Sequence, residues 1–338
     1  MSSRPTMSDV ARAAGVHKAT ASRALNPDTS GLVNAATARR VLLAARELGY
    51  TPNTMARGLR TSRSHTVGVL IPDLTNPLFP PIVRGIETAL SARDYTALIA
   101  NTDNDDAQET SRFEALLGRH VDGLILATGR REHPLLQAAH ERGVRAVLVN
   151  RGTERPLYPV VTGDDAAGIA AAVDHLADLG HRRLLHLAGP AALSTGASRA
   201  RAFRQAVTAR QVDGTVVACS SYSIRAGEDA MRGALEHGAA PTGVVAGNDL
   251  IALGALRAVR AHGLRCPADV SVVGYNDMPF LDEVDPPLTS IHVPHHELGA
   301  EAARLLLQQL DGTPGPPKTI TLPVHLVIRA STAPPGPA

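Results

Sequence analysis

Residues 9–26 read DVARAAGVHKATASRALN, and this stretch decides the fold of the N-terminal part of the chain. Thr6 and Asp9 have the spacing of a capping box, and small apolar residues follow at helical intervals. Gly15 is expected to end this first helix, because glycine readily adopts the left-handed conformation found after helices. A second short helix follows directly. Two short helices joined by a glycine turn predict a helix-turn-helix.

A third helix completes the predicted N-terminal domain. It is expected to begin at an Asn34 N-cap and to end at Gly49, and its apolar face would close a small core. We therefore predict an all-α helix-turn-helix headpiece over residues 1–50. Residues 51–64 are basic and have no core of their own, so we interpret them as a linker.

Basic residues are concentrated at the N-terminal end. The whole chain has 338 residues and a net charge of +2, from 34 Lys and Arg residues against 32 Asp and Glu residues. Residues 1–64 contain ten basic and three acidic residues, which gives +7 there and leaves −5 for the remainder. A short basic segment joined to a mildly acidic body is typical of a nucleic-acid-binding domain attached to a second functional unit.

From residue 65 onward, short runs of β-branched residues alternate with longer helical patterns, which predicts βαβ units and parallel sheets. Eight strands are expected, at residues 67–71, 96–100, 123–127, 146–149, 184–188, 215–219, 244–246 and 270–273. Eight strands exceed one small sheet, so we divide the body into two α/β lobes. The tail, residues 286–310 and 319–329, is expected to add a strand, a helix and a further strand and to cross back between the lobes. The predicted first lobe comprises residues 65–163 and 293–325, and the predicted second lobe comprises residues 164–292 and 326–338.

Several functional classes are excluded by what the sequence lacks. No apolar run is long enough to span a bilayer and no signal peptide precedes the first helix, so we expect a cytoplasmic, nucleoid-associated protein. The two cysteines are far apart, which favours free thiols. No phosphate-binding or nucleophile motif is present, so we expect no enzyme activity and no cofactor. His292, His295 and His296 lie beside Pro294, which favours a surface or interface role, and we expect no metal site.

Longer motifs are more specific than the helix-turn-helix pattern alone. They occur in order as ARELGYTPNTMARGLRTSRSHTVGVLIPDLTNPLF (45–79), VDGLIL (121–126), HLADLGHRRLLHLAGP (175–190), AGNDLIALGALRA (246–258), DVSVVGYNDMPF (269–280) and PPLTSI (286–291). With these motifs the chain resembles the LacI/GalR family of bacterial transcriptional regulators over nearly its whole length. The resemblance implies a DNA-binding headpiece, a hinge helix over residues 51–64 and a two-lobed, periplasmic-binding-protein-like effector domain. Such proteins usually act as homodimers, and whether the dimers assemble further stays open.

Family correspondence implies which headpiece side chains contact DNA. Lys18, Ala19 and Arg23 match residues that read base edges in the major groove, where the two cations can donate to guanine and the alanine methyl can contact thymine. The remaining predicted contacts, to phosphates or from the hinge, are Thr6, Thr20, Ser22, Asn34, Tyr50, Asn53, Ala56 and Leu59. Leu59 matches the leucine that wedges between base pairs in the minor groove. His17 departs from the family, which usually has a small Ser or Thr cap at this position.

A small polar effector is expected in the cleft between the lobes, near the C-terminal ends of the strands. Family correspondence places seven residues there: Leu78, Phe79, Asn150, Arg199, Tyr222, Asn248 and Asn276. Aromatic faces for stacking, together with an arginine and several amides for hydrogen bonding, suit a sugar. The family often has Asp where this chain has Asn276, which alters the expected pattern of contacts to ligand hydroxyls.

The leading interpretation is a regulator, most simply a repressor, that binds a pseudo-palindromic double-stranded DNA operator and responds to a sugar. A periplasmic sugar-binding protein would share the two-lobed body, but the basic headpiece and the missing signal peptide oppose that alternative. A nucleotide-dependent enzyme is opposed by the lack of phosphate-binding motifs, since the fold alone does not fix the function. The effector, the operator and the sign of the effector response stay open at this stage.

Overall fold

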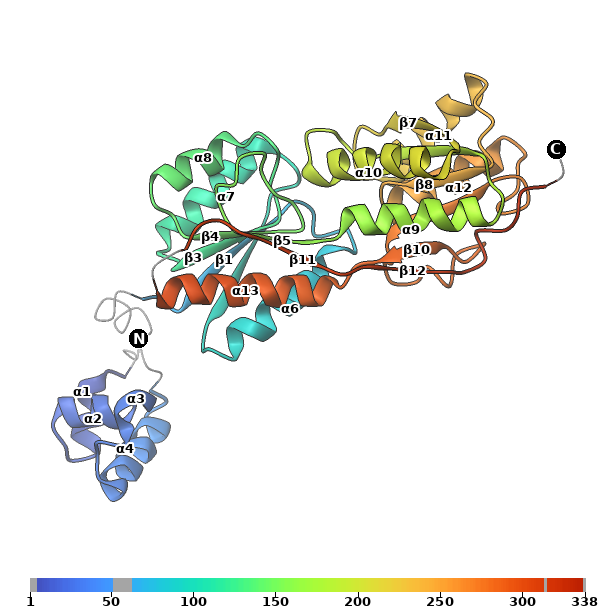
Figure 1. The fold of residues 1–338 in the computed structure, drawn as a ribbon. Coiled ribbons are helices and arrows are strands. Elements are labelled where there is room, and N and C mark those ends of the chain that lie inside the picture. Colours follow the sequence, from blue (N-terminus) through green and yellow to red (C-terminus); the bar gives the residue numbers. More distant parts are fainter. Residues whose placement is uncertain (1–4, 51–62, 313–314, 337–338) are drawn as a thin grey trace. The chain divides into compact units, whose positions relative to one another are not determined.

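A computed structural model describes residues 5–50, 63–312 and 315–336 of the chain. These residues belong to two compact units, a headpiece that ends at Ser64 and a body that begins at His65 (Figure 1). Among the described residues, no helix is long and apolar enough to cross a membrane.

The headpiece consists of helices α1 (Met7–Ala13), α2 (Lys18–Ala24), α3 (Pro27–Ser30) and α4 (Ala35–Glu47). The predicted capping box is present, because the Thr6 N–H donates to Asp9 Oδ2 over 2.9 Å and the Asp9 N–H donates to Thr6 Oγ1 over 3.4 Å. Gly15 follows α1 with a φ of +61°, which confirms the predicted glycine turn. The short helix α3 is an addition to the three predicted helices.

A small aliphatic core holds the headpiece helices together. Val10 of α1, Ala21 of α2 and Val41 of α4 are fully buried, and small alanines surround them. His17 and Asn34 cap α2 and α4, each by accepting a hydrogen bond from the backbone N–H two residues later. The His17 ring therefore performs the capping role of the small residue that the family usually has.

The body contains two six-stranded sheets (Figure 1). The first has the order β11-β5-β4-β3-β1-β2 and consists of β1 (Thr66–Ile71), β2 (Thr96–Asn101), β3 (Gly123–Leu126), β4 (Ala146–Val149), β5 (Val160–Gly163) and β11 (Thr319–Leu322). The second has the order β12-β10-β9-β8-β6-β7 and consists of β6 (Arg183–Ala188), β7 (Asp213–Ala218), β8 (Gly243–Ala246), β9 (Ser271–Asn276), β10 (Thr289–His292) and β12 (His325–Val327). Every pairing is parallel except that of β12 with β10. We call the parts built on these sheets the first lobe and the second lobe.

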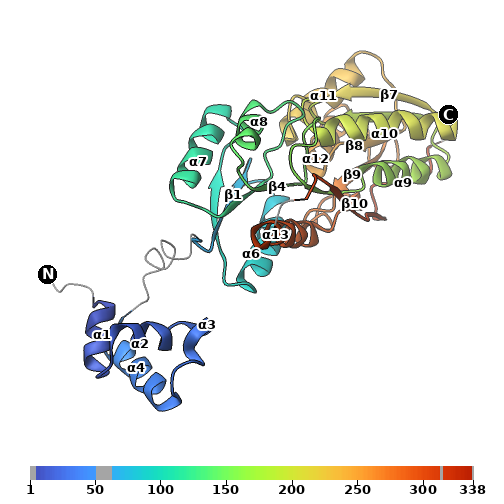
Figure 2. The same cartoon turned by 60° about the vertical axis from the view of Figure 1, so that its left-hand side comes forward.

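Helices cover both faces of each sheet. Those of the first lobe are α6 (Phe79–Ser91), α7 (Asp106–Gly118), α8 (Pro134–Glu141) and α13 (His295–Asp311), and those of the second lobe are α9 (Asp165–Asp178), α10 (Ser194–Arg210), α11 (Ile224–Glu236) and α12 (Asp249–Ala261). Val67, Val69 and Ile71 of β1 pack with α6 and α13, whereas Leu70 packs with α7 and α8, because side chains alternate along a strand. Figure 2 shows α13 beside α6. In the second lobe, α9 and α10 pack on one face, and α11 and α12 pack on the other.

The chain passes between the lobes three times within the described residues. It leaves β5 for α9 at residues 163–165, returns between β10 and α13 at residues 292–295, and crosses again between β11 and β12 at residues 322–325. Each predicted strand has a counterpart, including β10 for the first strand of the tail, and β5 is an additional strand. Residues 319–329 form two strands, β11 and β12, in different sheets where the sequence predicts one. The predicted fold class, a helical headpiece with a two-lobed α/β body, is confirmed.

Candidate functional site

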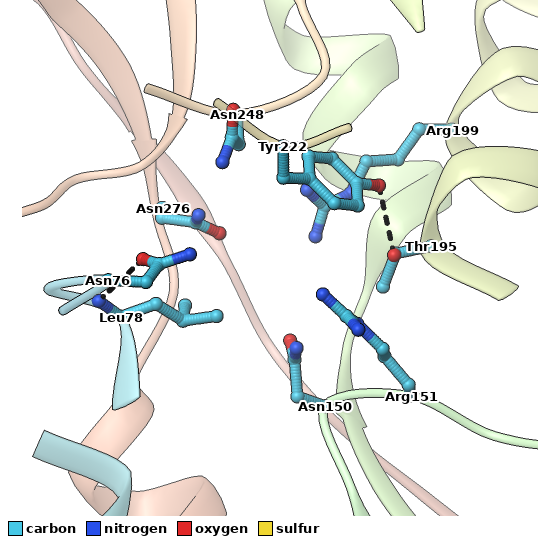
Figure 3. Close-up of a pocket in the computed structure, with 9 residues that line it drawn as sticks. All are labelled: Asn76, Leu78, Asn150, Arg151, Thr195, Arg199, Tyr222, Asn248 and Asn276. Carbon is cyan, nitrogen blue, oxygen red and sulfur yellow. Dashed lines mark hydrogen bonds between the residues drawn. The ribbon is translucent and has the colours of Figure 1, made fainter. Parts of the chain in front are cut away.

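A pocket lies between the two lobes, and nine residues line it (Figure 3): Asn76, Leu78, Asn150, Arg151, Thr195, Arg199, Tyr222, Asn248 and Asn276. The first four follow strands β1 and β4 of the first lobe, and the others end or follow strands β6 to β9 of the second lobe. Parallel strands present all their C-terminal ends at one edge of a sheet, so residues that are distant in sequence meet there. The topology therefore places these side chains around one space.

Arg199 is held by groups from three elements. Its Nε lies 2.8 Å from Asp165 Oδ1, and its Nη1 donates to the carbonyl oxygen of Gly247 over 2.6 Å. Its guanidinium carbon lies 3.7 Å from the centre of the Tyr275 ring. Burial alone would lower the pKa of Arg199, but the attraction of Asp165 and of nearby tyrosines raises this pKa above its ordinary value. Arg199 is therefore a fixed cation whose charge Asp165 balances.

Arg151 is a second buried cation in the pocket. Its side chain points into the space between the lobes (Figure 3), and the residue is 6% exposed. Its Nε has no hydrogen-bond partner, and no carboxylate in the described part of the chain forms an ion pair with it. Its guanidinium carbon lies 5.7 Å from the centre of the Tyr222 ring. Burial lowers the pKa of Arg151 below its ordinary value.

Two amide side chains present hydrogen-bond donors to the pocket. Asn76 Oδ1 accepts from the Leu78 N–H over 3.1 Å, and Asn248 Oδ1 accepts from the Ile251 N–H over 2.9 Å. Each oxygen is turned toward this backbone N–H, so the Nδ2 group of each amide faces the pocket (Figure 3). The Asn248 bond is also the N-cap of α12, so the start of that helix fixes the orientation of this amide.

Tyr222 forms an aromatic wall of the pocket. Its hydroxyl donates to Thr195 Oγ1 over 2.9 Å, and burial raises its pKa above the ordinary value. The ring fits because residue 189 is glycine: a Cβ at Gly189 would lie 2.2 Å from Cζ of the ring. A larger residue at position 189 would therefore displace Tyr222 from its place in the pocket.

Two backbone N–H groups of the first lobe donate hydrogen bonds to the second lobe at the rim of the pocket. The Gly152 N–H of the first lobe donates to Ser194 Oγ of the second lobe over 2.9 Å. The Arg131 N–H of the first lobe donates to the carbonyl oxygen of Ala192 of the second lobe, also over 2.9 Å. Neither bond uses a residue that lines the pocket, so both stabilise the closed arrangement of the lobes without a ligand. We call them the rim contacts.

Six of the seven residues predicted for the effector site line the pocket: Leu78, Asn150, Arg199, Tyr222, Asn248 and Asn276. Phe79 does not line it, because this residue begins α6 and lies in the core of the first lobe with 1% exposure. The prediction does not include Asn76, Arg151 and Thr195. Thr195 lies one helical turn before Arg199 on α10, and Arg151 follows Asn150 directly. Helical spacing and adjacency to a predicted residue are the signals that could have identified them.

In the headpiece, one side of α2 presents the residues predicted to read bases. Lys18, Ala19 and Arg23 are exposed, whereas Ala21 and Ala24 face the core. Ala19 and Arg23 are one helical turn apart, which explains why they share a face. The exposed side of α2 therefore carries the three side chains that the sequence predicts to read bases.

The other predicted DNA contacts are distributed around α2. Thr6 and Asn34 are exposed at the starts of α1 and α4, and both side chains cap their helices. Thr20, Ser22 and Tyr50 are partly buried. The hinge residues Asn53, Ala56 and Leu59 lie outside the described residues.

The chain is similar to known regulators at the level of sequence. Residues 6–53 match the model of bacterial regulatory proteins of the lacI family, and residues 173–332 match the periplasmic binding protein-like domain. The chain is 36% identical to the HTH-type transcriptional regulator CelR of Thermobifida fusca, over 97% of this chain and 98% of that protein. It is 34% identical to the HTH-type transcriptional repressor CytR of Escherichia coli strain K12, over 97% of this chain and 96% of that protein.

Solved structures agree with this similarity. The lac repressor dimer bound to operator and the anti-inducer ONPF matches with a TM-score of 0.86 and 28% identity, covering 98% of this chain and 100% of that one. The CelR–cellobiose complex matches with a TM-score of 0.74 and 33% identity, covering 97% of this chain and 100% of that one. These relatives are regulators rather than enzymes. The chain thus belongs to the lacI family of bacterial regulatory proteins and is a DNA-binding transcriptional regulator with a periplasmic-binding-protein-like effector domain.

Proposed function

We propose that this regulator is a repressor that binds a pseudo-palindromic operator as a homodimer and responds to a sugar bound between its lobes. The observation that carries the proposal is that polar side chains from both lobes line the pocket. Ligand binding there therefore depends on how the two lobes are arranged. In this proposal residues 1–50 read the operator and residues 51–64 form the hinge. The effector domain consists of a first lobe, residues 65–163 and 293–325, and a second lobe, residues 164–292 and 326–338.

The chemistry of the pocket supports a sugar. Tyr222 provides an aromatic wall on which a sugar ring can stack, and the amides of Asn76 and Asn248 provide donors for ring and hydroxyl oxygens. Related regulators hold sugars: the CelR structure contains cellobiose, and a LacI family regulator from Enterococcus faecium, 29% identical with a TM-score of 0.69, contains ribose. Arg199 would anchor the sugar, because its side chain is already fixed by Asp165.

Exposed apolar side chains on the body support a homodimer. Ile99 lies on β2, which is the edge strand of the first sheet, and it is 42% exposed. Phe280 lies in the second lobe after β9 and is 77% exposed. Contiguous exposed apolar surface is typical of subunit interfaces, and the lac repressor structure noted above is a dimer. Two-fold symmetry would then present two recognition helices to two half-sites.

A ligand can change DNA binding only through a difference in its affinity for two arrangements of the lobes. Because residues 65 onward continue directly from the hinge, closure of the lobes would alter the separation of the two hinges in a dimer. Such coupling is typically worth about 1 to 3 kcal/mol, or about 5- to 150-fold in operator affinity. The sign of the change distinguishes induction from co-repression.

The experiment begins with selection of DNA fragments by the purified full chain. We expect the selected site to be an inverted repeat that holds two chains in sedimentation, with an affinity that falls steeply with salt through counterion release. One chain per site, or an affinity indifferent to salt, would contradict the proposal. Operator binding is then measured with a panel of sugars, and a panel without effect on operator affinity would exclude a sugar effector.

A further inference from the structure

The charges inside the pocket do not balance. Arg199 is paired with Asp165 at 2.8 Å, whereas Arg151 has no carboxylate partner among residues 5–50, 63–312 and 315–336. Both arginines are more than nine-tenths buried, with exposures of 4% and 6%. The closed pocket therefore contains one uncompensated cation.

An unpaired buried cation raises the free energy of the closed protein, because the water that would solvate it is excluded. The contacts within the chain offset little of this cost. The Tyr222 ring is 5.7 Å from the Arg151 guanidinium carbon, near the outer limit of about 6 Å for a cation–π contact. No group in the described part of the chain accepts a hydrogen bond from the Nε of Arg151. An anion that enters the pocket would remove this cost, so the closed form favours an anionic ligand.

The rest of the lining points to the same ligand chemistry. None of the nine lining residues is Asp or Glu. The amide oxygens of Asn76 and Asn248 are turned toward backbone N–H groups, so both residues present Nδ2 donors to the pocket. A neutral sugar has many hydroxyl protons, which carboxylates accept best. The Arg151 guanidinium and these two Nδ2 groups give the pocket donors from both lobes, which suit a ligand that is rich in acceptors.

We propose that the effector is an acidic sugar derivative whose anionic oxygens, of a carboxylate or a phosphate, bind the guanidinium of Arg151. This inference rests on the proposed function and deepens it by giving the charge of the ligand. The planar guanidinium can donate two parallel hydrogen bonds to such a group, one of them from the Nε that now has no acceptor. Asn76 and Asn248 then donate to the remaining oxygens of the ligand.

The first experiment uses two simple anions as probes, inorganic phosphate and acetate. The melting temperature of the full chain is measured in phosphate, in acetate and in chloride at equal ionic strength, since a ligand that binds only the folded state raises it. We expect phosphate, acetate or both to stabilise the wild type and not Arg151→Met. Arg265→Met is the matched control, because Arg265 is exposed, pairs with Asp269 and does not line the pocket. Equal stabilisation of Arg151→Met, or no stabilisation of the wild type, overturns the proposal.

The Arg151→Met protein also reports on its own folding. Exchange of an unpaired buried cation for an apolar side chain of similar length removes the cost of burying the charge. We therefore expect this variant to melt in chloride at or above the wild-type temperature. Arg151→Lys is a second variant that keeps the charge but loses the planar fork, and it should retain part of the anion response. If Arg151→Lys responds no better than Arg151→Met, the charge at position 151 is not what binds the anion, and the proposal fails.

The second experiment titrates sets of ligands that share one skeleton and differ in charge, such as glucose, glucuronate and glucose 6-phosphate, and cellobiose with cellobionate. We expect an acidic member to bind the wild type about tenfold to a hundredfold more tightly than its neutral partner, and we expect Arg151→Met to lose this preference. Comparison of the affinities of the carboxylate ligands with that of the phosphate ligand shows which of the two anionic groups the pocket binds. Equal binding of neutral and acidic partners, or no binding of any acidic member, overturns the inference. A neutral sugar that changes operator affinity would also overturn the inference about ligand charge, but it would leave the proposed function intact.

Discussion

The guanidinium carbon of Arg199 lies 3.7 Å from the centre of the Tyr275 ring, and this contact joins the pocket to the core of the second lobe. Tyr275 is fully buried on β9, and its hydroxyl donates to the carbonyl oxygen of Asp164 over 3.4 Å. Gly168 on α9 leaves space for this ring, because a Cβ there would lie 2.6 Å from the tyrosine hydroxyl. The orientation of Arg199 therefore depends on packing beneath the pocket as well as on its ion pair with Asp165.

Exchange of Arg199 for Gln is expected to abolish the effector response. It also leaves the Asp165 carboxylate without its buried partner, so we expect the free energy of unfolding to fall by about 3 to 5 kcal/mol. Operator binding without effector should persist, because the headpiece is a separate compact unit. Calorimetric titration of the identified effector is the measurement, with Arg201→Gln, an exposed neighbour on α10, as the control. Equal effector affinity in Arg199→Gln and the wild type would remove Arg199 from the site.

Exchange of Lys18 or Arg23 for Ala is expected to relax the operator preference at particular half-site positions. Each loss should cost about 1 to 3 kcal/mol of discrimination if the side chain donates two hydrogen bonds to a guanine. Arg12 on α1 also carries one positive charge and is highly exposed, so Arg12→Ala controls for the loss of one charge. Binding to a library of operator variants measures the preference. A uniform loss over all sequences would assign the changed residue to a phosphate instead.

Exchange of Leu59 for Ala is expected to reduce bending of the operator and specific affinity, with little change in non-specific binding. The reason is that a wedged leucine unstacks a base step, which only a specifically bound duplex undergoes. Circular permutation of the operator in gel mobility assays reports the bend. If the variant bends and binds the selected operator like the wild type, Leu59 is not the wedge.

Exchange of Ser194 for Ala removes one rim contact and is expected to weaken effector binding about twofold to tenfold. The hydroxyl of Ser194 accepts from the Gly152 N–H of the other lobe, so its loss raises the free energy of the closed form without touching the pocket lining. Small-angle scattering without ligand should show a larger open fraction. Ser91→Ala, an exposed site at the end of α6, is the control. An unchanged dissociation constant would show that the rim contact does not limit closure.

His186 is expected to make the protein less stable in mild acid. Its ring is fully buried, lies 5.0 Å from the Phe203 ring, and bonds through Nδ1 to the carbonyl oxygen of Val245. Burial lowers the pKa of His186 from 6.5 to about 4. Between these values the unfolded chain binds a proton that the folded chain does not, so stability falls as the pH falls. The free energy of unfolding that depends on the neutral His186 ring, and that is lost across this pH range, is about 3 kcal/mol.

The effect of Asp249 on stability has the opposite pH dependence to that of His186. The test of His186 is therefore a comparison of the wild type with His186→Gln, since both proteins contain Asp249. Burial raises the pKa of Asp249 from 3.8 to about 6, and its contribution to stability therefore falls as the pH rises between these values. Denaturant unfolding of the wild type and of His186→Gln at pH 7.5, 6 and 5 separates the two effects. We expect the variant to be less stable at pH 7.5 and the gap to narrow toward pH 5. A gap that does not depend on pH would contradict the assignment.

Local sequence signals predict most of the fold. The capping box of Thr6 and Asp9 and the β-branched runs of the strands are decided by neighbouring residues, so they are visible in the sequence. Strand β5 (Val160–Gly163) is short and follows Pro159, and its pairing with β4 and β11 is a long-range choice that its four residues do not encode. The two strands of the tail are likewise separated by a crossing between sheets that no local pattern marks.

The candidate site is less predictable than the fold. Phe79 stands next to Leu78 in sequence, but it begins α6 at the helical spacing of Ile82 and Ile86 and therefore turns into the core. Arg151 stands next to Asn150, but its burial and its lack of a partner arise only when the two lobes close around it. Properties that depend on which elements meet across the cleft cannot be read from one segment.

The three crossings between the lobes also determine the order in which the protein can fold as it leaves the ribosome. The headpiece helices are complete when residue 47 has emerged. The first sheet, by contrast, receives its edge strand β11 only when residue 322 is made, and α13, which packs on α6, ends at residue 311. The nascent first lobe therefore keeps the side of α6 that packs on α13 uncovered until nearly the whole polypeptide has been translated. We expect early chain termination to yield a folded DNA-reading domain attached to an aggregation-prone remainder.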